Sequence, residues 1–591
     1  MKRIKVLTVV LAITLMVAGC SNTKTKQSSS DSSLQSQSSI DAKYINLTMV
    51  TPKTINPITN TDKSVGYIMN LVYDSLFTID ENYNVIPQLV KEYNIAQDGM
   101  SIDIKLKDAK WHDGKNVTSN DVNYTIGLIQ KSADSPYNEF TKNIASVNIK
   151  SDKDFTIKFK ARYAFSIDSL IFPIVSQNHL DSKDVNDKNN NMIGNGKYKI
   201  ESYTEREGMV LSVNKDYYEE VPKTMKNIKV GMVPNEEART SMVMALDSDI
   251  TNVTLNDLSK FQEKEFNITK YQGRDYECVL FNYNNPFFKD VNFRKAIAHS
   301  IDKDRIISEG YMDDATPVNF PLNSKSKYYN SEMKDLEFNK DKAIECLAKV
   351  EYANINSVNQ NDNKVKNQKK SAKKNSKKLT PEEEAKAKKA EEDRIKKEAE
   401  EKKNREKEEV KKSLSEMNLK IIVNRDNSER IKTANIINEN LKAIGINSTV
   451  NQLSDKDMEN ALNSKNYDLA LVGWKLSIIP DASSIIASSG YTDDKLNGYM
   501  SALTSSTSEI ETKKAYKDVQ TYIKDNATFI SLAVRNNYIV SNSRLKGKIT
   551  PNDFDVYEGI SNLDIKSNES NKMINFYLKS INYMIEYPYR V

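Results

Sequence analysis

The residue types that most enzymes and metal proteins use for chemistry are few and scattered in this 591-residue chain. Its three histidines, His112, His179 and His299, stand alone, and Cys278 and Cys346 lie far apart with no ligand-like spacing. Metal sites built on soft ligands need such residues in close groups. We therefore expect no metal and no cofactor, and two buried free thiols are favoured over a disulfide. The chain also has neither a Gly-x-Ser-x-Gly elbow nor a His-Glu-x-x-His helix, so a hydrolase is disfavoured.

The clearest binding chemistry lies between Tyr467 and Asp481. Residues 469–472 form a short, fully apolar run, which is typical of a strand buried on both faces. Gly473 and Trp474 follow where this strand ends. In open α/β sheets, ligands bind outside the carboxyl ends of strands, and a missing Cβ lets a ligand backbone come close. We expect Gly473 and Trp474 to contact a ligand, with ordinary core packing as the alternative for the Trp.

The segments around this strand predict a parallel sheet. Residues 419–423 and 447–453 have strand patterns, and residues 431–444 between them have helical spacing that ends at Gly445. With the strand at 469–473 this gives an alternation of strands and helices. Such an alternation is typical of α/β architecture.

The first part of the chain mixes strands and helices. Strands are predicted at 43–50, 100–106, 155–159 and 210–213, and helices at 65–77 and 293–307. A chain of 591 residues exceeds what one hydrophobic core usually serves, so two or more lobes are expected. The segment Gly194-Asn195-Gly196-Lys197 lacks the spacing and the Ser or Thr of a phosphate-binding loop.

A charged insertion interrupts the second part. Residues 354–379 lose all apolar periodicity, which predicts disorder. From Pro381 to about Lys412 the chain alternates acidic and basic residues at helical spacing, with only Ile395 and Val410 as large apolar residues. This pattern predicts a solvated helix about 45–50 Å long. A surface spacer is favoured over an arm that contacts the cell wall or a partner.

The charge balance limits the possible partners. The chain has 86 basic and 81 acidic residues and a net charge of +5. Proteins whose main task is nucleic-acid binding usually carry a stronger basic excess. We therefore expect no nucleic-acid partner.

The first residues predict export and lipid anchoring. Lys2, Arg3 and Lys5 precede an apolar run at 6–17, which is short for a membrane span but fits a signal peptide. Ala18-Gly19-Cys20 follows and resembles a bacterial lipobox, which implies cleavage after residue 19 and lipid attachment to Cys20. An ordinary signal peptide with a chance Cys is the alternative. Residues 20–43 would then form a flexible Ser-rich tether.

The order and spacing of several short segments is more specific than any one of them. These segments are Asn56-Pro57, Tyr73-Asp74-Ser75-Leu76-Phe77, Asp98-Gly99, Trp111-His112-Asp113-Gly114 with Asp121-Val122, Gly194-Asn195-Gly196-Lys197-Tyr198, Asn214-Lys215-Asp216-Tyr217-Tyr218, Phe281-Asn282, Pro286-Phe287, Arg294-Lys295-Ala296-Ile297 and Gly473-Trp474. In this order they resemble the family-five extracellular solute-binding proteins, which are oligopeptide- and dipeptide-binding lipoproteins of ABC importers. The similarity covers nearly everything from Tyr44 to about Phe554 apart from the charged insertion.

This resemblance implies an α/β, two-lobed fold of the periplasmic-binding-protein type II, with hinged lobes and an extra subdomain in lobe I. The implied boundaries are 44–65, 178–275 and 536–591 for lobe I, 66–177 for its extra subdomain, 276–535 for lobe II, and 354–412 for the charged insertion within lobe II. An extended peptide would lie between the lobes, with its backbone paired to strand edges.

The resemblance also implies roles for individual residues. Members that hold a free peptide amine usually carry Asp three residues after the Trp. Here that position is Ser477, a neutral hydroxyl, and Asp481 further along is a possible substitute. Arg425 or its neighbour Asn424 falls where dipeptide-type members bind the ligand carboxylate, and a solvated Arg at a strand end is an equal alternative.

Four further candidates for ligand contact lie near the two crossovers between lobes, although core or hinge packing is favoured for each. They are Tyr276, Phe281, Asn282 and Tyr538.

The implied function is that of a monomeric, lipid-anchored receptor on the outer face of the bacterial cytoplasmic membrane, which passes peptides to an ABC permease without catalysis. Within this class, the alternatives are a nickel complex, a sugar, or a signalling peptide that is sensed rather than imported. From different classes, an extracytoplasmic hydrolase and a scaffold or adhesin that acts through the charged arm are kept as rival hypotheses.

Overall fold

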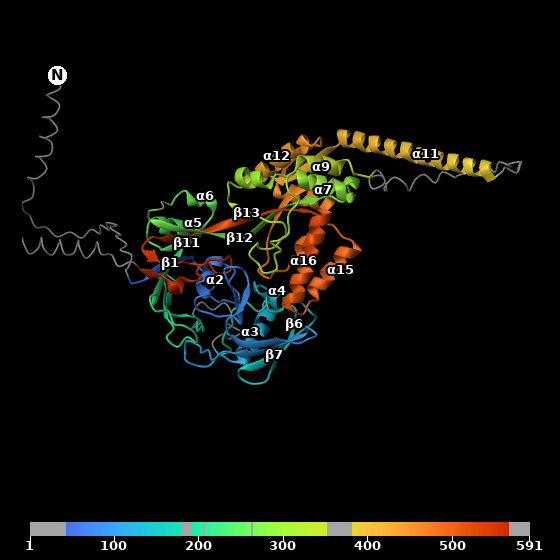
Figure 1. The fold of residues 1–591 in the computed structure, drawn as a ribbon. Helices are drawn as coiled ribbons and strands as arrows, with labels where there is room; N and C mark the ends of the chain where they lie inside the picture. Colours follow the sequence, from blue (N-terminus) through green and yellow to red (C-terminus); the bar gives the residue numbers. More distant parts are fainter. Residues whose placement is uncertain (1–42, 179–191, 206, 262–263, 352–380, 566–591) are drawn as a thin grey trace, which may run out of the picture. The chain divides into compact units, whose positions relative to one another are not determined.

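The computed structural model (Figure 1) describes residues 43–178, 192–205, 207–261, 264–351 and 381–565. The expected signal peptide, Cys20, the tether up to residue 42 and the segment 354–379 lie outside these ranges. In the described ranges, no helix is both long enough and apolar enough to cross a bilayer.

Lobe I is built on a four-stranded sheet. Its strands, in spatial order, are β1 (Ile45–Val50), β10 (Asn227–Val233), β9 (Gly208–Val213) and β8 (Tyr198–Thr204). β1 runs parallel to β10, and the remaining pairs are antiparallel. The helices α2 (Lys63–Met69) and α5 (Glu236–Met244) contact β1.

The extra subdomain adds a second sheet to lobe I. This antiparallel sheet has the order β4 (Val90–Ile95), β5 (Ser101–Leu106), β7 (Asp154–Phe159) and β6 (Ile144–Ile149). It is accompanied by the hairpin of β2 (Phe77–Ile79) with β3 (Val85–Pro87), and by α3 (Ser119–Lys131) and α4 (Asn138–Thr141). Buried Ile102, Ile104 and Leu106 alternate with more exposed residues along β5, which confirms the strand predicted at 100–106. The two sheets of lobe I share one apolar core.

Lobe II contains most of a seven-stranded sheet. Its order is β11 (Ile250–Val253), β17 (Ile530–Asn542), β12 (Phe266–Phe281), β16 (Leu469–Lys475), β14 (Asn418–Asn424) and β15 (Asn447–Leu453), with β13 (Ala315–Pro317) beside β17. β14 runs parallel to both β15 and β16, which confirms the predicted parallel arrangement.

Helices cover both faces of this sheet, and successive residues of β16 pack against different helices. Leu469 and Leu471 belong to the same core as α7 (Val291–Ser300) and α12 (Ser428–Ala443). Ala470 and Val472 belong to the core that includes α13 (Asp455–Ser464) and α16 (Glu509–Asn526). The apolar run of β16 is therefore buried on both faces, as predicted.

The remaining elements are short or peripheral. They are α6 (Leu255–Leu258), α8 (Lys303–Arg305), α9 (Lys340–Leu347), α14 (Ser483–Ser488), α15 (Asp494–Thr504), β18 (Leu545–Lys546), β19 (Asp564–Ile565), the 3-10 turns η1 (Pro286–Lys289) and η4 (Ile560–Asn562), and the π-helical turn η2 (Ile306–Gly310).

Strands β12 and β17 run through both lobes. In lobe I, β17 pairs with β11, and in lobe II, β12 pairs with β16. Between Gln272 and Tyr276 the register of β12 against β17 shifts. A Cβ on Gly273, inside this interval, would lie 2.9 Å from the carbonyl oxygen of Arg535. The interruption bends the strand pair at the junction of the lobes, where a hinge motion would be accommodated.

Two predicted helices are shorter than their sequence patterns suggest. The helix expected at 65–77 ends at Met69, because the carbonyl oxygens of Leu71 and Val72 accept hydrogen bonds from the backbone of residues 195–198. The helix expected at 293–307 is interrupted at Ile301, which has an extended backbone, and Asp302 caps a new turn. Contacts with distant segments override the local helical spacing in the first case.

The charged insertion contains α11 (Pro381–Glu416), a helix of 36 residues. Figure 1 shows it extending away from α7, α9 and α12. Ile395 is 56% exposed, whereas Val410 is 5% exposed and belongs to the lobe II core. The last turns of α11 are therefore attached to the folded body, whereas residues 388–405 are exposed.

We predict that Val410→Asp lowers the free energy of unfolding by about 2–4 kcal/mol, because it removes a buried side chain and buries a carboxylate. Ile395→Asp on the same helix is the matched control and should change it by less than about 0.5 kcal/mol. Denaturant titrations of both variants measure the effect. Equal destabilisation by the two substitutions would contradict the attachment at Val410.

Candidate functional site

Two adjoining cavities lie where the lobes meet. The first has a volume of about 430 Å³ and is lined by Gly473, Trp474 and polar residues at the start of α12. The second has a volume of about 810 Å³ and is lined by Lys63 and Tyr67 of α2, by Arg239 of α5, and by Asp553. Both cavities are in the size range of ordinary ligand pockets. They share the lining residues Thr254, Asp275, Lys475 and Asn537, so we treat them as one cleft.

Gly473 makes room for a buried ion pair. It lies opposite Glu277 of β12, and Arg430 donates from Nε to Glu277 Oε2 at 2.6 Å and from Nη2 to Oε1 at 3.2 Å. A Cβ on Gly473 would lie 2.1 Å from Arg430 Nη2. The expected space beside Gly473 therefore exists, but the guanidinium from the first turn of α12 fills it.

The Arg430–Glu277 pair is charged and nearly enclosed. Glu277 is 3% exposed. Burial raises the pKa of Glu277 above its ordinary value, although the Arg430 guanidinium opposes this rise. For Arg430, burial alone would lower the pKa, but the carboxylate raises it. Removing either partner would leave an uncompensated buried charge, which typically costs about 3–5 kcal/mol.

A second ion pair borders the first cavity. Arg535 Nη2 lies 3.2 Å from Glu429 Oε1. Glu429 and Arg430 are neighbours in the first turn of α12, which begins after its N-cap residue Asn427. One helical turn thus supplies a carboxylate and a guanidinium to the same wall of the cavity.

Trp474 lies at the boundary between core and cavity. It pairs with Tyr276 of β12, so the strand alternation directs it away from the face that carries Gly473 and Lys475. Its ring packs against the core on the α16 side while the residue lines the first cavity. It is therefore not enclosed within lobe II.

Asp553 connects the lobes at the crossing strands. Its Oδ2 accepts from Arg274 Nε at 2.9 Å and lies 3.4 Å from Lys475 Nζ, and its Oδ1 accepts from Asn537 Nδ2 at 3.1 Å. Burial alone would raise the pKa of Asp553, but Arg274 and Lys475 together lower it below its usual value. Lys475 of β16 is thereby joined to the C-terminal segment that packs on lobe I.

Ser477 and Asp481 lie beside the cleft rather than in it. Both line a small void of about 20 Å³. The carboxylate of Asp481 accepts from the hydroxyl of Tyr163 at 2.9 Å and from the backbone of Ser483 at 2.9 Å. Tyr163 belongs to the extra subdomain, so Asp481 joins the two lobes in this conformation.

Asn424 and Arg425 do not line either cavity of the cleft. Asn424 donates to Asp455, and the exposed side chain of Arg425 lies 3.9 Å from Asp426. Of the arginines that follow β14, Arg430 rather than Arg425 lines the first cavity.

The four crossover candidates are buried by more than nine-tenths. Tyr276 shares a hydrogen bond with Ser531 and borders the first cavity. Phe281 stacks on Phe288 with ring centroids 5.0 Å apart. The remaining two make polar contacts within the protein: Asn282 donates to the carbonyl oxygens of Lys465 and Tyr467, and Tyr538 donates to Asp314.

Patterns in the sequence did not identify the charged residues of the cleft. Those that line its two cavities include Lys63, Arg239, Asp275, Glu277, Glu429, Arg430, Lys475, Arg535 and Asp553, and Arg274 pairs with Asp553. For two of them a local signal existed. Lys475 directly follows Trp474, and Arg430 sits three residues after the cap Asn427, which accepts from its backbone nitrogen.

Donor groups for a bound metal are sparse. The described ranges hold no group of three or more His, Cys, Asp or Glu residues arranged to hold a metal ion. Cys278 and Cys346 are free thiols, and Cys278 is buried. Burial raises the pKa of both thiols, so neither is activated as a nucleophile.

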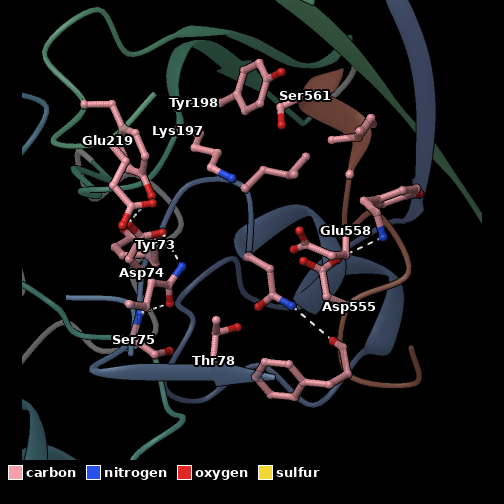
Figure 2. Close-up of a pocket in the computed structure, with 18 of the residues that line it drawn as sticks. Tyr73, Asp74, Ser75, Thr78, Lys197, Tyr198, Glu219, Asp555, Glu558 and Ser561 are labelled. Atoms are coloured by element: carbon pink, nitrogen blue, oxygen red, sulfur yellow. Dashed lines mark hydrogen bonds between the residues drawn. The ribbon is translucent and has the colours of Figure 1, made fainter. Parts of the chain in front are cut away.

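A separate cavity of about 180 Å³ lies within lobe I. Figure 2 shows Asp74 and Glu219 on one side of it and Asp555 and Glu558 on the opposite side, with Lys197 between the two groups. Asp74 accepts from the hydroxyls of Tyr217 and Tyr218 and from Gln88.

Asp74 and Asp555 of this lobe I cavity have raised pKa values. Burial raises the pKa of Asp74 to about 6, although the hydrogen bonds from Tyr218 and Tyr217 oppose the rise. Burial and the nearby Glu558 raise the pKa of Asp555 to about 7. Asp74 is only 2% exposed, and its hydrogen bonds join two segments that the sequence analysis had identified separately. These contacts indicate a structural role for Asp74.

The comparison with protein families identifies one match. Residues 84–497 match the model of the bacterial extracellular solute-binding proteins, family 5 Middle.

Individual relatives are distant but extensive. The chain is 23% identical over 504 residues to the oligopeptide-binding protein AppA of Bacillus subtilis (strain 168), which covers 81% of this chain and 84% of that protein. It is 28% identical over 283 residues to the nickel-binding protein NikA of Staphylococcus aureus, which covers 47% of this chain and 56% of that protein.

The fold is similar to solved structures. The ABC transporter substrate-binding protein CtaP of Listeria monocytogenes superposes with a TM-score of 0.66 at 20% identity, over 89% of this chain and 99% of that one. The two-lobed architecture expected from the sequence is thus confirmed.

We predict that Gly473→Ala lowers the free energy of unfolding by about 1–3 kcal/mol, because the added methyl group displaces the Arg430 guanidinium from its buried carboxylate. The matched control is Gly498→Ala in α15, where a Cβ meets nothing within 4 Å. That substitution should stabilise the protein by up to about 1 kcal/mol through helix propensity. Denaturant titration measures both effects. If Gly473→Ala left the free energy of unfolding unchanged, the close approach of the Arg430 guanidinium to Gly473 would be contradicted.

A second prediction concerns pH. The folded chain keeps a proton on Asp74 up to about pH 6, whereas the unfolded chain loses it near the ordinary value of 3.8. Between these values the folded state binds more protons, so this group's contribution to stability falls as pH rises. From pH 4 to 7.5, the free energy of unfolding of the wild type should fall by about 2–3 kcal/mol relative to Asp74→Asn.

The control for this experiment is Asp108→Asn, which changes a carboxylate that is 98% exposed. The free energy of unfolding of this variant should change with pH in the same way as that of the wild type. If Asp74→Asn did so as well, the proposed titration of Asp74 would be refuted.

Proposed function

The chain belongs to the bacterial extracellular solute-binding proteins of family 5, a family of binding proteins rather than enzymes, and from this premise we propose that it captures peptides in the cleft between its lobes. In this proposal the occupied protein delivers its ligand to the permease of an ABC importer. The binding step needs no covalent chemistry.

The observation that carries the peptide assignment is an open strand edge in the cleft. Within the described residues, β14 pairs with β16 only at Leu469 and Ala470. The last three residues of β16, which are Gly473, Trp474 and Lys475, pair with β12 on their opposite side. Their second edge therefore offers backbone groups to an extended peptide, which would add to the sheet by β-augmentation.

The name of AppA, an oligopeptide-binding protein, supports the same assignment. The polar groups around the edge suit a ligand that carries both charges and backbone amides. Gly473, Trp474 and Lys475 would contact the peptide directly. Ser477, Asp481 and Tyr276 border this region, whereas Phe281, Asn282 and Tyr538 would act by supporting it.

The location is part of the proposal. The basic and apolar pattern of residues 1–19 followed by Cys20 supports export, cleavage and lipid attachment at the outer face of the cytoplasmic membrane. Residues 20–43 would leave the binding lobes free to reach a permease. We propose that the protein acts as a monomer.

A nickel complex is the second candidate, because NikA is a relative. With no ready-made donor group in the described ranges, nickel would enter with its own small-molecule ligands. A sugar, a sensed signalling peptide, and a scaffold that uses α11 rank below these two candidates.

We predict that a mixed peptide pool raises the melting temperature of the full chain. Binding should add about 2.7 kcal/mol to the free energy of unfolding when free peptide exceeds Kd 100-fold. Trp474→Ala should abolish this ligand-induced shift. Trp111→Ala is the matched control: Trp111 is 2% exposed in the lobe I core, so the variant should lose stability but keep the shift.

Differential scanning calorimetry with peptides and with nickel–histidine distinguishes the candidates. A shift with nickel–histidine and none with any peptide pool would replace the peptide assignment. An undiminished peptide shift in Trp474→Ala would remove Trp474 from the site.

A further inference from the structure

Three cationic side chains from different parts of the chain surround one carboxylate at the junction of the lobes. Arg274 Nε and Lys475 Nζ lie 2.9 and 3.4 Å from Asp553 Oδ2. Lys63 lines the second cavity together with Lys475 and Asp553. Lys63 comes from the first turn of α2 in lobe I and Lys475 from the end of β16 in lobe II, so the two ammonium groups approach the cavity from opposite lobes.

The carboxylate of Asp553 does not balance these charges. It is 5% exposed at its side chain and already accepts from Arg274 and from Asn537. At Asp553 itself, one negative charge faces these three positive ones, and the exposed carboxylates of Glu237 and Asp275 line the same cavity. Burial, followed by the adjacent Lys475 ammonium, lowers the pKa of Lys63, which is the effect that crowded like charges produce.

The two lysines are more exposed than Arg274 and are therefore more accessible to a ligand. The Arg274 side chain is 14% exposed and also donates to the carbonyl oxygen of Leu476 at 3.0 Å. Lys475 is 38% exposed at its side chain, and Lys63 is an exposed residue whose ammonium group is partly buried beside Lys475. Both side chains line the cavity and can therefore reach a ligand in it.

The same cavity is lined by a buried guanidinium. Arg239 is 1% exposed and donates to Thr48, Glu236 and Asn252, and it also interacts with the hydroxyl of Tyr557. Its guanidinium is therefore held by groups of the protein itself.

Carboxylates also line the second cavity, but most of them are already occupied. Glu236 pairs with Arg239, Asp257 pairs with Lys260, and Asp62 caps α2. The remaining two, Glu237 and Asp275, are exposed.

We propose that Lys63 and Lys475 together bind a carboxylate of the ligand and so connect the two lobes through it. This inference rests on the proposed peptide-binding function and specifies the ligand class: peptides with a free C-terminal carboxylate or an acidic side chain at the corresponding position. The carboxylate relieves the repulsion between the two ammonium groups and replaces it with two charge-assisted hydrogen bonds. A ligand without it leaves like charges facing each other across the cleft.

The test uses calorimetric titration of the full chain with four pools of synthetic pentapeptides. One pool has free C-termini and no acidic side chains, and a second is its C-terminally amidated counterpart. The third and fourth are amidated and carry one Glu or one Gln. Wild type should bind the free-acid pool, the amidated Glu pool, or both, at least about 10-fold more tightly than the neutral amidated pools, as expected for a charged hydrogen bond. The first two pools distinguish the C-terminus from a side chain as the source of the carboxylate.

The variants identify the residues responsible. Lys63→Gln and Lys475→Gln should each weaken binding of the preferred carboxylate pool about 10-fold more than they weaken binding of the neutral amidated pools. Lys91→Gln, on the exposed face of β4, is the matched control and should change nothing.

Equal affinity of wild type for all four pools would overturn the inference, even though peptide binding itself would stand. A loss that is the same for every pool in the lysine variants would overturn it too, because the lysines would then not act on a carboxylate. If no pool bound at all, the peptide assignment would fail and this inference with it.

Discussion

The pairing of β12 with β17 in both lobes is the constraint on which the rest of the structure depends. These two strands are hydrogen-bonded on both sides of the junction, with Phe266 opposite Asn542 in lobe I and Val279 opposite Ile530 in lobe II. The lobes can therefore move relative to each other only as this pair bends. The register shift after Gln272 is where such bending is least costly, because ladder hydrogen bonds are already interrupted there.

The charged groups of the cleft are arranged around this bending point. Arg274 and Asp275 lie inside the interrupted interval, and Glu277 lies just beyond it. Two of them are matched by a group from a distant segment: Asp553 for Arg274, and Arg430 for Glu277. Because a buried charge without its partner is costly, these pairs disfavour other arrangements of the neighbouring elements. The exposed groups, Asp275 and Lys475, remain for a ligand.

Periodicity in the sequence predicted several of the elements, but neither the ends of two helices nor the site that the elements create. The parallel strands around β14 and the doubly buried β16 followed from local patterns. The Arg430–Glu277 pair did not, because 153 positions separate its members and no local pattern encodes that contact. Arg425 and Arg430 illustrate the difference. Both follow β14, but the helix that starts after Asn427 carries Arg430 to the cavity wall, whereas Arg425 stays on the surface.

The central claim is that a peptide lies between the lobes and pairs with the free edge of β16. A crystal structure of the full chain with a bound peptide tests this most directly. The account predicts an extended peptide backbone hydrogen-bonded to the segment from Gly473 to Lys475, with groups of both lobes in contact. A peptide found in the lobe I cavity, or on a surface remote from β16, would contradict it.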